Sequence, residues 1–155
     1  MYKPYKVKKE FEITEFFSAF EYKCDGTYSF SGELHDFWEI LIVLDGKIHV
    51  VADELVYSIS KNQVKFHKPM EFHSLCADAE GNSRYFVISF NASGNFIDRF
   101  SNRVINLSDS QVKQLNLILD IYRKEYSELL DPEITVFLEK ISQKPYLFQK
   151  FTNSL

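Results

Sequence analysis

The pattern of hydrophobic and polar positions divides the chain near residue 107. Before this point, short apolar runs recur at intervals of about 8 to 12 residues, separated by turn signals such as Asp25-Gly26 and Asp45-Gly46. This arrangement is typical of antiparallel barrels and jelly rolls. We therefore predict a mainly β fold, with strands near 11–22, 28–31, 35–44, 47–52, 55–59, 64–67, 72–77 and 84–90.

The apolar run at 35–44 predicts a strand that is buried on both faces, because of its length and its β-branched residues. Side chains alternate across a strand, so His35, Phe37 and Glu39 are expected to share one face. Trp38 falls on the opposite face, where we expect it to pack between the sheet and a helix.

The spacing of apolar residues becomes helical after residue 107. Ser108 and Gln111 form a capping-box pair, which predicts the start of a helix that runs to about Leu130. Pro132 suits the first turn of a second helix, and the apolar segment 146–155 is able to begin a third. The apolar stripe of the first helix includes Leu115, Ile118, Leu119, Tyr122 and Tyr126.

Length, charge and cysteine content narrow the class of protein to which the chain can belong. A chain of 155 residues has the length of one domain, and we divide it into an N-terminal arm at 1–10, a barrel at 11–107 and a helical segment at 108–155. The net charge of −4 argues against a chain that grips nucleic acid by itself, because such binding needs Lys and Arg to neutralise phosphates. Cys24 and Cys76 have no CxxC spacing and no apolar run reaches the length of a membrane span, so we expect a cytoplasmic location and no membrane contact.

Two short motifs carry a resemblance to a known family. His35 and Glu39, followed by six residues and a glycine, resemble the second half of the first cupin motif, and Pro69 with His73 resembles the second. The segments GELHDFWEILIVLDG and FHKPMEFHSL, followed along the chain by the predicted helices, are similar to the N-terminal sensor domain of AraC-type (AraC/XylS) transcriptional regulators. This resemblance covers about residues 15–140.

The resemblance implies a cupin-like antiparallel β-barrel, or jelly roll, followed by two or three C-terminal α-helices. It also implies that the barrel binds a small effector, that a helix after the barrel forms a homodimer, and that a C-terminal pair of helix-turn-helix motifs binds DNA. We expect DNA contact only through that last part, which these residues do not contain. The leading expectation is therefore effector sensing and dimerisation, with no catalysis and no cofactor.

One interpretation of the polar residues in these two motifs is an effector pocket. In such a pocket, a few polar groups inside an apolar wall orient a small molecule such as a sugar or a small acid. The alternative is that the polar members only hydrogen-bond one another and hold the barrel mouth together. His49 and His67 are expected to be ordinary paired strand histidines. The predicted pocket residues are His35, Phe37, Glu39, Leu41, Glu71, His73 and Leu75.

A metal site is the other interpretation. The resemblance places the ligands of metal-binding cupins at His35, Glu39 and His73, and imidazole with carboxylate suits zinc, iron or manganese. Metal cupins have HxH where this chain has Glu33-Leu34-His35, although Glu33 still offers an oxygen. AraC-type sensors usually hold no metal. The alternative function is therefore a small metal-dependent cupin enzyme.

The stripe on the helix from residue 108 is expected first to cover the sheet. Because apolar surface at helical spacing commonly marks an association face, we also predict that this helix forms a homodimer.

Overall fold

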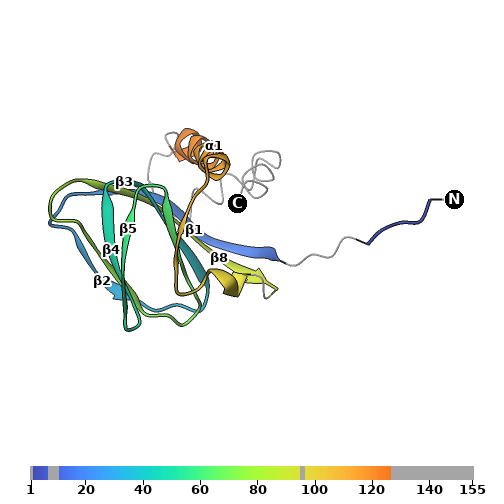
Figure 1. Ribbon diagram of the computed structural model, residues 1–155, viewed down its shortest axis with the longest axis horizontal. Helices are drawn as coiled ribbons and strands as arrows, with labels where there is room; N and C mark the ends of the chain where they lie inside the picture. The colour runs from blue at the N-terminus through green and yellow to red at the C-terminus, as the bar shows by residue number, and fades with distance from the viewer. Residues whose placement is uncertain (1, 7–10, 95–96, 127–155) are drawn as a thin grey trace.

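The computed structural model describes residues 2–6, 11–94 and 97–126, and most of these residues lie in antiparallel β-sheets (Figure 1). The strands are β1 (Glu12–Cys24), β2 (Ser29–Glu33), β3 (Trp38–Asp45), β4 (Lys47–Ala52), β5 (Leu55–Ser60), β6 (Gln63–His67), β7 (His73–Ala77), β8 (Ser83–Ser93) and β9 (Val104–Asn106). A 3₁₀ helix, η1 (Ile97–Phe100), precedes β9, and one α-helix, α1 (Asp109–Tyr126), follows it within the described residues. The mainly β prediction is confirmed, whereas the predicted second and third helices lie outside the described residues.

Two sheets pack against each other and together form the barrel. The five-stranded sheet has the order β1-β8-β3-β6-β9, and the four-stranded sheet has the order β2-β7-β4-β5. β3 lies at the centre of the larger sheet, where it pairs antiparallel with β8 on one side and β6 on the other. This central position explains the nearly continuous apolar run, because both faces of the strand are covered.

The start of β3 corrects one prediction. The strand begins at Trp38, which pairs with Phe90, so His35 and Phe37 lie in the connection that precedes it. The apolar run therefore extends beyond the hydrogen-bonded ladder, because part of it crosses from one sheet to the other.

The predicted alternation along β3 is confirmed. Leu41 and Val43 belong to an inner core between the two sheets, whereas Trp38, Ile42 and Leu44 belong to an outer core beneath α1. The inner core comprises Cys24, Leu41, Val43, Ile48, Val50, Ala52, Ile59, Ala77, Tyr85 and Val87. The outer core comprises Ala19, Trp38, Ile42, Leu44, Val64, Phe86, Ile88, Phe90, Ile97, Leu115, Ile118, Leu119, Ile121 and Tyr122.

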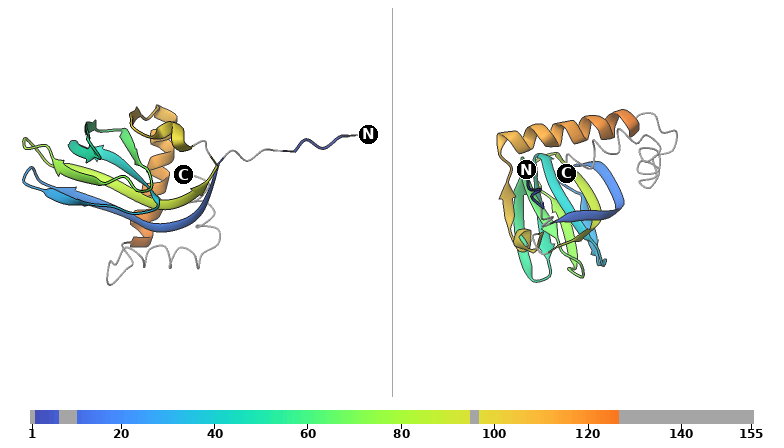
Figure 2. Two further views of the ribbon diagram at one scale, coloured as in Figure 1. Left: turned by 90° about the horizontal axis from the view of Figure 1, so that it is seen from below. Right: turned by 90° about the vertical axis from the view of Figure 1, so that its right-hand side faces the viewer.

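α1 lies across the outer face of the five-stranded sheet (Figures 1 and 2). Tyr122 accepts a hydrogen bond from the Glu21 amide at 3.2 Å, and Arg123 donates two hydrogen bonds to the Glu21 carboxylate at 2.8 and 2.9 Å. The predicted stripe is thus turned toward the chain's own sheet, and a homodimer through α1 would have to use the opposite face of the helix. Four of the five stripe residues are buried in the outer core, namely Leu115, Ile118, Leu119 and Tyr122, and the side chain of Tyr126 lies outside what the structure describes.

Two tight turns follow the sequence signals. Gly46 has a φ of 72°, and a Cβ at this position would collide with the Asn82 carbonyl oxygen. Asn62 has a φ of 62°, a left-handed conformation that asparagine tolerates in the turn between two strands. These turns fix the register of the strands that carry the inner core.

The capping box at the start of α1 is formed as predicted, and it gives a direct test. The Ser108 amide donates to Gln111 Oε1 at 2.9 Å, and the Gln111 amide donates to Ser108 Oγ at 3.4 Å. Ser108→Ala is expected to lower the free energy of unfolding by about 1 kcal/mol, measured by urea denaturation followed by circular dichroism. Ser108→Gly is the control, since glycine is tolerated at this position, and should lower the free energy of unfolding by only about a few tenths of a kcal/mol. Equal stability of Ser108→Ala and the unmodified chain would contradict the cap.

Candidate functional site

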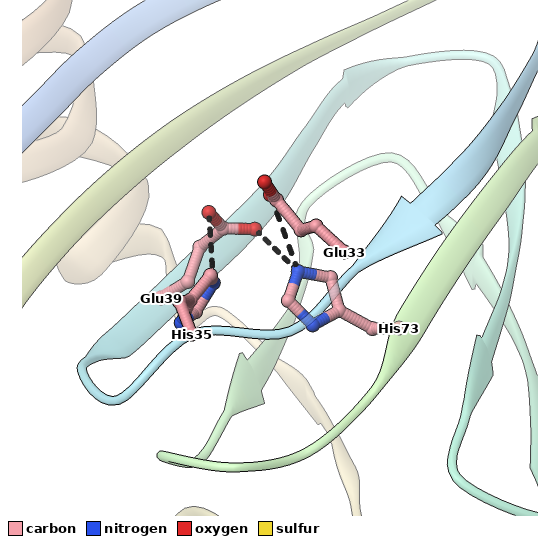
Figure 3. A group of neighbouring side chains, drawn as sticks. All are labelled: Glu33, His35, Glu39 and His73. Atoms are coloured by element: carbon pink, nitrogen blue, oxygen red, sulfur yellow. Dashed lines mark ion pairs between the residues drawn. The ribbon is translucent and has the colours of Figure 1, made fainter.

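Four side chains converge at one end of the barrel, and their potential ligand atoms all lie within 4.8 Å of one another (Figure 3). We call Glu33, His35, Glu39 and His73 the His–Glu cluster. Glu33 ends β2 and pairs in register with His73 at the start of β7, so both belong to the four-stranded sheet. Glu39 belongs to β3 of the other sheet, and His35 lies in the connection between them. The cluster therefore bridges the two sheets.

The groups of the cluster are close, but they do not hydrogen-bond one another. His73 Nε2 lies 3.4 Å from Glu39 Oε1 and 3.6 Å from Glu33 Oε1, and His35 Nε2 lies 3.8 Å from Glu39 Oε2. Both Nε2 atoms are buried and have no hydrogen-bond partner in the described part of the chain. The polar groups thus face one another at ion-pair distances, without hydrogen bonds of standard geometry between them.

The other nitrogen of each imidazole is anchored to the backbone. His35 Nδ1 lies 3.0 Å from the Phe37 carbonyl oxygen, and His73 Nδ1 lies 3.0 Å from the Glu71 carbonyl oxygen. A carbonyl oxygen only accepts, so each Nδ1 carries a proton and donates it. In a neutral imidazole this leaves Nε2 with a lone pair that points into the cluster.

Glu39 is held as a carboxylate. Its Oε2 accepts a hydrogen bond from Ser89 Oγ on the neighbouring strand β8 at 3.1 Å. Burial alone would raise the pKa of Glu39, but the adjacent imidazoles of His35 and His73 lower this pKa to about 2. Burial would likewise lower the pKa of His73, whereas Glu39 and the Glu71 carbonyl raise it. The cluster thus keeps negative charge in a buried position.

A second buried group contacts the cluster, and sequence reasoning missed one of its members, Lys65. Lys65 Nζ donates to Glu71 Oε1 at 3.1 Å, and His67 Nδ1 lies 2.8 Å from the same oxygen. Lys65, His67 and Glu71 are 0%, 1% and 1% exposed, and the His67 ring stacks on His73 with 4.1 Å between centroids. Lys65 and His67 lie two residues apart on β6, so the alternation of side chains was a signal that they share the inner face.

The placement of Glu71 corrects a second prediction. Its carboxylate was expected to line the pocket, but it is used by Lys65 and His67, and only its backbone carbonyl reaches the cluster through His73. Burial would raise the pKa of Glu71, but the hydrogen bond from His67 and the charge of Lys65 lower it. Burial lowers the pKa of both Lys65 and His67. His67 is the paired histidine that was predicted, although it also contacts the site.

Of the residues predicted as an apolar wall, Phe37 contacts the cluster directly. Phe37 stacks on His35 with 4.0 Å between ring centroids and 7° between planes, and Phe17, which the sequence did not single out, stacks on Phe37 at 4.3 Å. Leu41 is fully buried in the inner core, and Leu75 packs against that core from the opposite sheet. Two imidazoles and two carboxylates in one cluster are chemically suited to hold zinc, iron or manganese, or the polar groups of a small molecule.

A separate apolar cavity of about 340 Å³ lies on the other side of the five-stranded sheet, between that sheet and α1. Its lining includes Ile42, Ile88 and Leu115 and none of the four residues of the cluster. Among the described residues, no helix is long and apolar enough to cross a membrane.

The chain is similar to one protein family and, more distantly, to several solved structures. Residues 18–141 match the family model of the AraC-like ligand binding domain. The cupin domain of Schizosaccharomyces pombe Cnp3 is 12% identical, with a TM-score of 0.44, over 61% of this chain and 72% of that one. A cupin protein from Bacteroides fragilis is 14% identical, with a TM-score of 0.46, over 68% and 98% of the two chains. A predicted oxalate decarboxylase from Thermotoga maritima is 18% identical, with a TM-score of 0.45, over 47% and 64%.

No curated protein matches the chain. The solved structures share little sequence with the chain, so its family membership rests on the match to the family model.

Proposed function

The chain belongs to the family of AraC-like ligand-binding domains, and from this premise we propose that it senses a small-molecule effector for a transcriptional regulator. The single observation that carries this proposal is the family match over residues 18–141, which includes most of the barrel, the His–Glu cluster and α1. The net charge of −4 supports a division of labour in which another part of the regulator contacts DNA. A cytoplasmic location and a homodimer belong to the same proposal.

The effector site that we propose is the His–Glu cluster with its apolar wall. The unpartnered Nε2 atoms of His35 and His73 support this choice, because buried polar atoms normally have a partner and a bound ligand would supply one. Phe37 stacks on His35, and Leu41 and Leu75 pack in the inner core between the same two sheets. A few convergent polar groups within an apolar wall are the usual composition of a small-molecule site.

A thermal-shift screen of sugars and small acids tests this proposal. A ligand at 100 times its dissociation constant adds about 2.7 kcal/mol to stability, which corresponds to a rise of roughly 5 to 10 °C in Tm for a chain of this size. We expect such a rise for the unmodified chain and its loss in His35→Ala and Glu39→Ala. His49→Ala is the matched control, since His49 pairs with Ser58 and Asp78 and is not part of the cluster. Stabilisation that survives both cluster variants would contradict the site as placed.

A second candidate function is a small metal-dependent cupin enzyme that uses the same four residues. The observation in its favour is the donor set, since two imidazoles and two carboxylates suit a catalytic metal. The two candidates differ in what happens to the bound molecule. An NMR spectrum of the stabilising compound that stays unchanged after incubation with the metal-treated chain supports sensing, whereas new product signals support the enzyme.

A further inference from the structure

We propose that the cavity between α1 and the five-stranded sheet binds one small, uncharged aromatic molecule. This second ligand site goes beyond the proposed function, because it lies on the other side of the sheet from the His–Glu cluster and shares no residue with it. Its volume, its lining and the polar groups at its opening each support the proposal.

The volume of the cavity is about 340 Å³. Protein interiors contain few voids larger than a water molecule, because unfilled space forfeits dispersion contacts. This cavity nevertheless borders Ile88 and Phe90 of the outer core, which are 0% and 1% exposed. An apolar cavity of about 150 Å³ already holds benzene, so this larger cavity has room for roughly two fused rings.

The lining disfavours water as the occupant. The sheet contributes Ile42 and Ile88 to the cavity, and α1 contributes Leu115 from the other side. The polar side chains of the lining, Gln111 and Gln114, are both exposed, whereas a buried water needs about two to four polar partners. The lining among the described residues includes no charged side chain, so an ionised ligand would leave its charge unpaired. An uncharged, mainly apolar molecule is therefore the occupant that suits the cavity.

Aromatic side chains in the lining favour a flat ring over an alkyl chain. Phe66 stacks on Phe100 with 5.0 Å between ring centroids and 21° between planes, and both rings line the cavity and are half-buried. Phe11 and Phe90 also line it. Contacts between aromatic rings stabilise a complex beyond the apolar area that they bury.

The opening of the cavity defines one more property of the ligand. Gln111 and Gln114 on α1 are the exposed members of the lining, so they mark where the cavity meets solvent. Gln111 Oε1 accepts hydrogen bonds from the Ser108 amide at 2.9 Å and from Ser108 Oγ at 2.8 Å. The amide nitrogen of Gln111 is therefore the group that donates to a ligand. We expect the ligand to carry a carbonyl or hydroxyl oxygen at this end.

Fluorescence titration with prodan, an uncharged naphthyl ketone, tests this site, because prodan emission shifts to shorter wavelength in apolar surroundings. We expect one equivalent of prodan to bind to the unmodified chain with a saturable shift. Ile105→Trp, which places a larger side chain in the cavity from β9, should weaken binding at least about 10-fold. Leu117→Phe is the matched control and should leave the affinity unchanged, because Leu117 packs against the outer core but does not line the cavity.

Two further measurements locate the bound prodan. His35→Ala should bind prodan as tightly as the unmodified chain does, because His35 belongs to the His–Glu cluster and not to the cavity. Hydrogen exchange should show that prodan protects amides of α1 more than those of β4, because β4 packs in the inner core. Circular dichroism confirms that each variant is folded, and Leu107→Phe, at a second lining position, replaces Ile105→Trp if that variant is not.

The inference is overturned if the unmodified chain gives no saturable shift, which is also the result expected if another part of the chain fills the cavity. Equal affinity of the cavity-filling variant and the unmodified chain overturns it as well, and so does loss of binding in His35→Ala. A chain that binds no prodan but is stabilised by a sugar or a small acid loses this second site and keeps the proposed sensing site.

Discussion

Replacement of Glu71 by alanine is expected to lower the free energy of unfolding by about 3 to 5 kcal/mol. The Glu71 carboxylate is 1% exposed and accepts hydrogen bonds from Lys65 Nζ at 3.1 Å and from His67 Nδ1 at 2.8 Å. Without it, Lys65 keeps a buried ammonium group whose remaining hydrogen bond is to the Phe66 carbonyl. An uncompensated buried charge costs much more than the ion pair itself contributes. Urea denaturation followed by the fluorescence of buried Trp38 measures the loss.

The comparison with a double variant shows whether the cost comes from the stranded charge. Lys65→Met combined with Glu71→Gln removes both charges and should be more stable than Glu71→Ala alone, because no ion is left unpaired. Glu54→Ala is the matched surface control and should change stability by less than about 0.5 kcal/mol, because Glu54 is exposed. A loss below about 1 kcal/mol in Glu71→Ala would contradict the role assigned to this network.

Phe86→Ala is expected to cost a similar amount, about 3 to 5 kcal/mol, for a different reason. Phe86 is 0% exposed in the outer core and meets Tyr122 of α1 edge to face, with 5.1 Å between ring centroids. Truncation removes apolar contacts on both sides of the interface and leaves a cavity that the stiff central strands cannot close. Chemical denaturation measures the total loss.

Hydrogen exchange locates this loss within the molecule. Amides of α1 should lose protection in Phe86→Ala more than those of β4, because β4 packs in the inner core on the other side of the sheet. Phe86→Leu is the control, and its loss of unfolding free energy should be less than half of the loss in Phe86→Ala. Equal loss of protection in α1 and β4 would argue against two separately packed cores.

Sequence reasoning succeeded where one local pattern determined the structure. The alternation from Trp38 onward and the capping box at Ser108 follow from backbone geometry, so both are confirmed. The start of β3 was wrong by three residues, because a continuous apolar run does not show where hydrogen bonding to β8 begins. β9 was not predicted, since a strand of three residues is defined by its pairing with β6 and leaves little pattern of its own.

The site was predictable only in part. His35, Glu39 and His73 were identified because motif spacing places them together, and the structure brings them within reach of Glu33. Lys65 was not identified, because a lysine is normally exposed and its burial depends on a partner across a turn. The same contact across the turn occupies the carboxylate of Glu71. Contacts of this kind depend on how the connection between β6 and β7 folds rather than on the order of residue types.

The position of β3 between two cores has a mechanical consequence. Along this one strand, Glu39 faces the His–Glu cluster while the next residue in either direction packs toward α1. A ligand that displaced Glu39 would therefore act on the same strand whose other face supports α1. Thermodynamic linkage makes this coupling reciprocal: a partner that clamps α1 in one orientation must change ligand affinity by the same factor as the ligand changes the partner's. The strand β3 is thus shared by the proposed ligand site on one face of the sheet and by the helix-supporting surface on the other.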